Sequence, residues 1–166
     1  MIMRVESYPA AGVDSDRRLQ FRPMRTSTEV LEKFYAAVNR NDMQAIATDF
    51  DPQIVRVEPD GFPTAGTYRG IADVQAHVAH GRGTWAEGTC EPERYQVHGD
   101  TVVVYVHVRV RLNGVTEWLD ARFADGFVVR NGKIAEFRTF AERADALAWA
   151  GIDDQPADYS PVSPSD

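Results

Sequence analysis

Two acidic side chains are the first candidates for chemistry: Glu58 shares its parity with Ile54 and Arg56 on an expected strand, and Asp125 stands on an apolar strand face. Glu58 closes the strand expected over 53–58, and Asp125 lies between two phenylalanines of the same parity. A carboxylate in the surroundings of Asp125 loses hydration, so it stays neutral, finds a partner or takes part in chemistry. The structural alternatives are that Glu58 pairs with Arg56 or supports the following turn, and that a bulge at Asp125-Gly126 turns the acid to solvent.

Two histidines are the next candidates. His77 and His80 stand three residues apart on the helix expected over 71–80, after Asp73. This spacing permits a metal face, but catalytic metal sites generally use three protein ligands and no further ligand set is apparent. His77 is otherwise an acid–base group at the mouth of a pocket, or an exposed helical side chain, the more common situation. We predict no metal and no cofactor, and we place His77 among the candidate substrate-binding residues.

Covalent catalysis finds little support. No serine occurs between Ser27 and Ser160, which excludes a Ser–His–Asp triad inside the expected domain. The two lysines, Lys33 and Lys133, fall on a helix and in a hairpin, which are poor places for a Schiff base. Cys90 is the single cysteine, so no internal disulfide forms, and we expect it to be an ordinary side chain near the start of a strand.

Composition narrows the class of protein. The 166 residues carry 18 Lys and Arg against 25 Asp and Glu, a net charge of −7, which argues against nucleic-acid binding. Apolar residues make up 43 %, enough for a core, yet no apolar run reaches the length of a membrane span. The first ten residues lack a signal-type stretch, so we expect a soluble, cytoplasmic protein without a membrane partner.

The ends of the chain differ from its middle. Pro, Gly and Arg without a period fill the first residues, and Pro, Ser and Asp dominate the last ones. We therefore predict a flexible segment over 1–25, one domain over 26–150 and a disordered tail over 151–166.

Helical signals come first along the domain. Thr26 and Glu29 stand at capping-box spacing ahead of apolar residues at helical intervals. A shorter helix starts at Met43 and stops at Asp51-Pro52. After the strand over 53–58 we expect a loop to Gly70 and the helix over 71–80. The apolar face of the first helix should comprise Val30, Leu31, Phe34, Tyr35 and Val38.

Strands dominate the second half. Turn residues at 99–100, 113–114 and 131–132 separate the runs expected over 93–98, 101–112, 115–130 and 133–141, and a helix is expected over 143–150. Helices grouped ahead of an antiparallel sheet predict an α+β fold: a cone-shaped curved antiparallel sheet with helices packed on its concave face, enclosing a pocket.

The outer face of this sheet mixes aromatic and arginine side chains, a composition typical of interfaces. We therefore predict a homodimer through this face; the alternative is an exposed amphipathic sheet. Its expected members are Tyr105, His107, Arg109, Arg111, Trp118, Asp120 and Arg122.

The order of elements resembles the nuclear transport factor 2-like superfamily, and within it the SnoaL-like and ketosteroid-isomerase-like proteins. The stretches FYAAVNRNDMQAIATDF, VRVEPDG, GTYRGIADVQAHV and FVVRNGKIAEFR carry the resemblance, over roughly residues 27–150. The resemblance implies that Glu58-Pro59 stands where ketosteroid isomerases carry their Asp-Pro base. It also implies that Asp125 stands where they carry the protonated acid of the oxyanion hole. In those enzymes an apolar site keeps this carboxyl group neutral.

One element of that resemblance is missing. Phe34 stands where these isomerases carry an oxyanion-stabilising tyrosine, and Tyr35 is rotated by about 100° around a helix. A substrate smaller than a steroid, or another reaction, therefore fits better. The Asp–His dyad of dehydratase-like members is not evident. The Asp-Arg-Asp set of epoxide hydrolases of this fold is not evident either, because Thr139 occupies one of its positions.

From these observations we expect a SnoaL-like protein that acts by proton transfer on a small hydrophobic carbonyl or polyketide-like compound. Glu58 would be the base and Asp125 the acid or hydrogen-bond donor. A non-catalytic ligand-binding or dimerisation module is the alternative. The expected pocket lining is Phe34, Val38, Glu58, Val106, Val108, Phe123, Asp125, Phe127 and Phe137, with His77 at its mouth.

Overall fold

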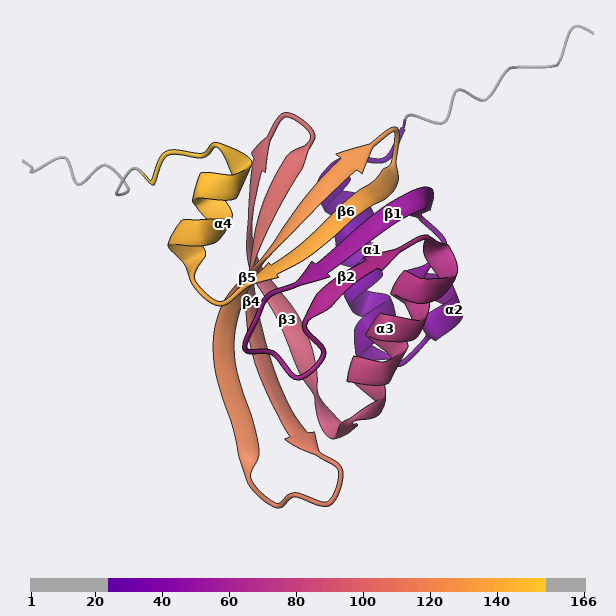
Figure 1. The fold of residues 1–166 in the computed structure, drawn as a ribbon, viewed down its shortest axis with the longest axis vertical. Helices are drawn as coiled ribbons and strands as arrows, with labels where there is room; N and C mark the ends of the chain where they lie inside the picture. Colours follow the sequence, from indigo (N-terminus) through magenta and orange to yellow (C-terminus); the bar gives the residue numbers. More distant parts are fainter. Residues whose placement is uncertain (1–23, 155–166) are drawn as a thin grey trace, which may run out of the picture.

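A computed structural model describes residues 24–154, and the expected end segments over 1–25 and 151–166 lie mostly outside them. Within this range the chain forms four helices and one six-stranded sheet (Figure 1). None of these helices is both long and apolar enough to span a membrane. The elements are α1 (Ser27–Asn39), α2 (Met43–Ile46), β1 (Phe50–Glu58), β2 (Gly66–Arg69), α3 (Ile71–Gly83), β3 (Trp85–His98), β4 (Thr101–Leu112), β5 (Trp118–Arg130), β6 (Lys133–Phe140) and α4 (Arg143–Ala150).

Helix α1 begins where the sequence predicts. The Thr26 hydroxyl accepts a hydrogen bond from the Glu29 N–H at 3.2 Å, and the Glu29 carboxylate accepts one from the Thr26 N–H at 3.2 Å. A cap of this kind stabilises a helix by about 1 kcal/mol. The buried face is wide enough to include both Phe34 and Tyr35. Because of this width, both aromatic side chains face the sheet and line the cavity described below.

The sheet has the strand order β2-β1-β6-β5-β4-β3, and β1 runs parallel to β6 while the other neighbours are antiparallel. Strand β2 occupies part of the expected loop to Gly70; it is a four-residue edge strand without an alternating apolar pattern. Strand β3 starts at Trp85 rather than Glu93. Register shifts near Glu87 and Pro92 interrupt its period, and Pro92 is tolerated because β3 is an edge strand.

The long hairpins follow their turn signals. Asn131 and Gly132 both adopt positive φ, 51° and 72°, as a tight two-residue hairpin requires. Strand β5 begins at Trp118, three residues later than expected, because 113–117 form the turn and its exit. The expected alternation along β4 and β5 is present, with Val104 opposite Asp125 and Val106 opposite Phe123.

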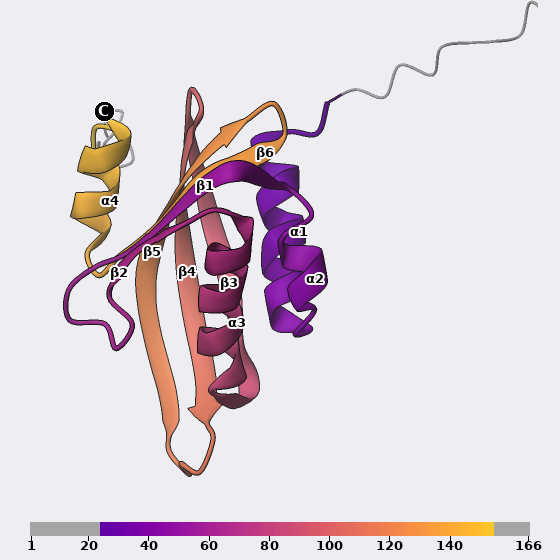
Figure 2. The same ribbon diagram turned by 45° about the vertical axis from the view of Figure 1, so that its right-hand side comes forward.

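The helices lie on both sides of the sheet (Figure 2). Helices α1, α2 and α3 cover the concave face, and the main core lies between them and the sheet. Helix α4 packs on the opposite face, where Leu147 and its neighbours cover Val103 and Ala124. A Cβ atom at Gly126 would lie 2.6 Å from the Trp149 ring, so this close approach requires glycine. The α+β prediction is confirmed, with α4 as an added layer on the outer face.

Candidate functional site

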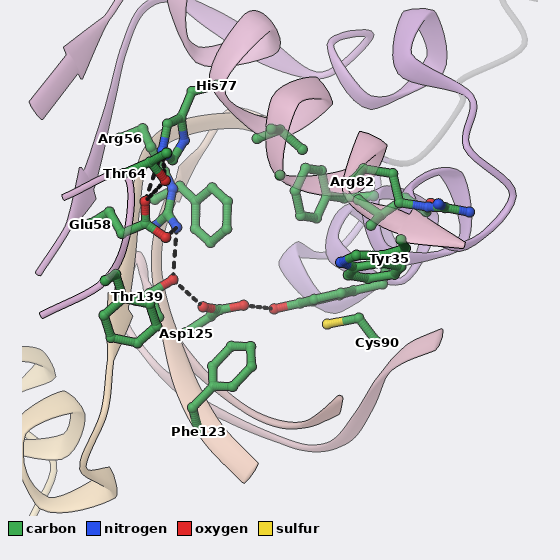
Figure 3. A pocket seen from close by; sticks show the side chains of 17 residues that line it. Tyr35, Arg56, Glu58, Thr64, His77, Arg82, Cys90, Phe123, Asp125 and Thr139 are labelled. Atoms are coloured by element: carbon green, nitrogen blue, oxygen red, sulfur yellow. Dashed lines mark hydrogen bonds and ion pairs between the residues drawn. The ribbon is translucent and has the colours of Figure 1, made fainter. Parts of the chain in front are cut away.

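A cavity of about 200 Å³ lies between α1, α3 and the concave face of the sheet (Figure 3). Its walls are largely apolar, and a small set of polar groups from distant parts of the chain converges on it. The polar lining residues are Tyr35, Arg56, Glu58, Thr64, His77, Arg82, Asp125 and Thr139. Apolar walls with a few directed polar groups are typical of small-molecule sites.

Most of the expected pocket residues line this cavity, but three do not. Phe127 is fully buried and its ring stacks on Phe137 at 4.6 Å, so it supports the wall from behind. Val106 is likewise sealed in the core, and Val108 lines an adjoining groove. Their parity is as expected, but none of the three lines this cavity. The residues that do line the cavity are Phe34, Val38, Glu58, His77, Phe123, Asp125 and Phe137.

Asp125 faces inward from β5 and is only 2 % exposed, so the alternative of a solvent-facing bulge is wrong. Its Oδ2 accepts a hydrogen bond from the Tyr35 hydroxyl at 2.6 Å, and its Oδ1 accepts one from the Thr139 hydroxyl at 2.7 Å. Burial raises the pKa of Asp125, against the opposing influence of Arg56 and these two hydrogen bonds. The site therefore favours a protonated acid more than water does.

Tyr35 carries a phenol hydroxyl into the site, although Phe34 stands at the helix position where the resemblance indicates a tyrosine. Although Tyr35 lies about 100° around α1 from Phe34, the helix packs with both side chains buried against the sheet, as the expected apolar face implies. The hydroxyl of the Tyr35 side chain reaches Asp125 (Figure 3). Burial and the neighbouring acid raise the pKa of Tyr35 well above its usual value, so it acts as a proton donor in hydrogen bonds. The spacing Leu31–Tyr35–Val38 on one helical face was the available signal.

Arg56 connects the two acids. Its side chain is 6 % exposed and its guanidinium donates to the Thr139 hydroxyl at 2.9 Å, which donates in turn to Asp125. The same guanidinium nitrogen lies 3.9 Å from Oε1 of Glu58. The guanidinium also sits over the Phe137 ring, 3.9 Å from its centroid. One buried cation thus serves two carboxyl groups.

Glu58 stands at the end of β1 in a second polar cluster. Its Oε2 accepts a hydrogen bond from the Thr64 hydroxyl and lies 2.9 Å from Nε2 of His77. The His77 side chain is 7 % exposed and stacks on Tyr68 with ring centroids 4.0 Å apart. The interpretation of His77 as an exposed helical side chain is therefore wrong. His77 shares a helical face with the apolar residues Val74 and Val78, and this spacing was a signal for its burial. Thr64 lies in a loop, where no periodic pattern indicates that its side chain faces the cavity.

Sheet register sets the separation of the two clusters. Glu58 ends β1, Thr139 lies on β6 and Asp125 faces Thr139 from β5. Neighbouring strands are about 4.8 Å apart, so the backbones carrying the two acids are separated by roughly 10 Å. Both acids nevertheless line the same cavity.

The remaining candidates do not join these clusters. Cys90 borders the cavity, but burial raises the pKa of its thiol well above the usual range, which leaves it unreactive. Among residues 24–154, no three His, Cys, Asp or Glu side chains gather as they would around a metal ion. His80 is exposed, while His77 is engaged with Glu58.

Comparison with known proteins agrees with this fold. The SnoaL-like domain family matches residues 31–137, and the chain therefore belongs to that family. No protein of the curated set matches it.

Solved structures extend the comparison. An NTF2-like protein from Burkholderia thailandensis E264 is 30 % identical, with a TM-score of 0.64, over 80 % of this chain and all of that one. TerC, co-crystallised with polyporic acid, is 21 % identical with a TM-score of 0.62, over 75 % of this chain and 97 % of its own. A putative polyketide cyclase from Sinorhizobium meliloti is 20 % identical with a TM-score of 0.56, over 68 % and 94 %. The suspected nuclear transport factor 2-like superfamily is thus confirmed.

Proposed function

We propose that this SnoaL-like protein is an enzyme that binds a small, largely apolar carbonyl compound and moves a proton within it. Glu58 is the base and the Tyr35–Asp125 pair is the hydrogen-bond donor. The observation that carries the proposal is that both clusters line one cavity, with the Tyr35 hydroxyl 2.6 Å from Asp125 at one side and Glu58 at the other. The co-crystallised TerC and the putative polyketide cyclase support a ligand of this general class.

The chemistry proposed is an enolisation. The Glu58 carboxylate removes a proton from the carbon next to the carbonyl, and the electron pair of that C–H bond moves onto the carbonyl oxygen. Return of the same proton from Glu58 to another carbon of the enolate, as the electron pair moves back from the oxygen, completes an isomerisation. No oxidant or reductant is needed.

The Tyr35–Asp125 pair stabilises the oxygen on which charge develops. A proton on Oδ2 of Asp125 donates to the Tyr35 oxygen, which frees the phenol hydrogen for the ligand, while Oδ1 still accepts from Thr139. The raised pKa of Asp125 favours this arrangement. Such a donor is worth on the order of a hundredfold in rate.

Deuterium exchange tests the proposal without knowledge of the natural substrate. The probe is 2-tetralone, a bicyclic ketone with acidic hydrogens beside its carbonyl, followed by proton NMR in D₂O. We expect the protein to accelerate exchange, and Glu58→Gln to lower the accelerated rate by about a hundredfold or more while leaving it above the buffer rate. Glu117→Gln, at an exposed glutamate, is the matched control. Exchange at the buffer rate with 2-tetralone and with a monocyclic 1,3-diketone would contradict the proposed reaction.

One observation favours a second candidate, a non-catalytic ligand-binding module. Both oxygens of Asp125 already accept hydrogen bonds within the protein, which is how a structural acid is satisfied. A module of this kind binds apolar compounds in the cavity and does not exchange their hydrogens. The exchange experiment and a binding assay on the same compound separate the two candidates.

We also propose that two copies associate through the outer sheet face. Helix α4 covers its Val103–Ala124 region and leaves the remainder open, where Arg109 lies over the Trp118 ring at 4.6 Å. Asp120 bonds His107, and Glu93 bonds Arg122 beside them. Sedimentation of the wild type and of Trp118→Glu tests this: a dimer that the substitution dissociates supports it, and a wild-type monomer contradicts it. The cytoplasmic location stays a prediction.

A further inference from the structure

The two oxygens of Glu58 are in different surroundings. Oε2 accepts from the Thr64 hydroxyl and lies 2.9 Å from Nε2 of His77, so one oxygen receives both contacts. Oε1 has no hydrogen bond within residues 24–154, and its nearest charged neighbour is Arg56 at 3.9 Å. The carboxyl group is thus held by one oxygen, and the other is free to meet a ligand.

The groups that hold Oε2 are themselves fixed. The Tyr68 ring stacks on His77 at 4.0 Å, and the Tyr68 hydroxyl donates to the Thr64 carbonyl at 2.8 Å. One residue of β2 therefore restrains both the imidazole on α3 and the loop that carries Thr64. Glu58 is the last residue of β1, where the backbone alone would leave its side chain poorly restrained.

The hydrogen-bond partners of His77 identify its tautomer. Nδ1 is buried and has no partner within the described residues. A buried N–H without an acceptor is rarer and costlier than an acceptor without a donor. The neutral ring protonated at Nε2 meets this condition, because its single N–H then donates to Glu58 and its lone pair stays at Nδ1.

We infer that Thr64 and His77 are positioning residues for Glu58, which bind its Oε2 and leave Oε1 directed to the ligand as the base. The inference rests on the proposed function of Glu58, but the arrangement itself is observable without turnover. Neither residue needs to touch the substrate to act. Misplacement of a reacting group by about 1 Å costs on the order of a hundredfold in rate.

Two pairs of variants test this role in the 2-tetralone exchange assay. Thr64→Val removes the hydroxyl at constant shape, whereas Thr64→Ser keeps it. His77→Phe keeps a ring against Tyr68 without a donor, whereas His77→Gln keeps an N–H. We expect the first member of each pair to lower kcat roughly tenfold to a hundredfold with KM within about twofold, and the second to recover most of it. Equal kcat within either pair overturns the inference for that residue.

The Glu58→Gln background shows whether the two residues act through Glu58. Adding Thr64→Val or His77→Phe to that variant should not lower the residual exchange further. An additional tenfold loss would mean that they act directly on the substrate and would overturn the positioning role. Thr64 lies in a partly exposed loop, so its variants keep the test decisive if His77→Phe fails to fold.

Nitrogen-15 NMR of His77 in the free protein separates this inference from the proposed function. We expect a neutral ring with the proton on Nε2, and an altered Nε2 resonance in Glu58→Gln. A proton on Nδ1 with a bare Nε2 overturns the arrangement whether or not the protein is an enzyme. If the NMR result holds while the wild type shows no exchange, the proposed function has failed and the arrangement has not.

Discussion

The hydroxyl of Tyr35 on α1 and the carboxyl group of Asp125 on β5 are joined by a hydrogen bond of 2.6 Å inside the core of the molecule. The two residues are 90 positions apart, and both side chains are almost entirely closed to water. A hydroxyl that is hydrogen-bonded to an acid in apolar surroundings forms a site suited to binding a polarised oxygen.

Removal of the Tyr35 hydroxyl should impair turnover and stability together. In Tyr35→Phe we expect 2-tetralone exchange to fall by about a hundredfold, because an oxyanion donor is lost. The free energy of unfolding should fall by about 1–3 kcal/mol, since a buried acid loses a partner. Tyr95→Phe is the matched control, as its buried hydroxyl has no partner within residues 24–154. Equal behaviour of the two variants would speak against a special role for Tyr35.

Asp125 should make stability depend on pH. Burial raises its native pKa above the ordinary 3.8, so the folded chain keeps this proton to higher pH than the unfolded chain does. Its contribution to stability is complete below pH 3.8 and is lost as pH rises through the raised native pKa. Relative to the wild type, Asp125→Asn should therefore gain free energy of unfolding with rising pH across that window. Urea unfolding at a series of pH values measures this, and a pH-independent difference refutes it.

The Thr139 hydroxyl should stabilise the fold as a link between Arg56 and Asp125. It accepts from the guanidinium at 2.9 Å and donates to the acid at 2.7 Å. Thr139→Val keeps the shape and breaks both contacts, which should cost about 1–3 kcal/mol in urea unfolding. Thr139→Ser keeps the hydroxyl and should recover most of that loss. If valine and serine are equivalent, the link contributes nothing.

Arg56 should be the most costly polar residue of the site to remove. Arg56→Met leaves Glu58 and Asp125 without their buried cation, so we expect a loss of about 3–5 kcal/mol at neutral pH. The loss should shrink in acid, where both carboxyl groups are protonated. Arg122→Met breaks an exposed pair with Glu93 and should change the free energy of unfolding little, because water screens that pair. A pH-independent loss in Arg56→Met would contradict this charge balance.

Strand positions could be predicted from the sequence wherever one face is buried. Alternation along β4 and β5 placed Asp125 inward, because a period of two assigns each side chain to a face. The same logic missed β2 and the first half of β3. Both strands lie at sheet edges. Strand β2 is too short to show a period, and the register shifts of β3 interrupt its period.

Contacts between distant elements were harder to predict. Phe34 and Val38 of the first helix were expected in the pocket lining and Tyr35 was not, whereas the packing of α1 also brings Tyr35 to Asp125. The burial of His77 depends on Tyr68 and Thr64, which lie in a region expected to be an unpaired loop. The position of α4 on the outer face depends on the contact between Trp149 and Gly126 of β5. No pattern of neighbouring residues in the sequence indicates this contact.

The most direct test of the account is whether the two clusters act on one ligand. The probe is 4-nitrophenol, whose phenolate oxygen resembles an enolate and whose visible absorbance reports both binding and ionisation. Glu58→Gln should bind the phenolate more tightly than the wild type, because a neutral amide replaces a like charge, and Tyr35→Phe should bind it at least about tenfold more weakly. If either substitution leaves this affinity unchanged, Glu58 and Tyr35 do not face the same molecule and the proposed proton transfer is wrong.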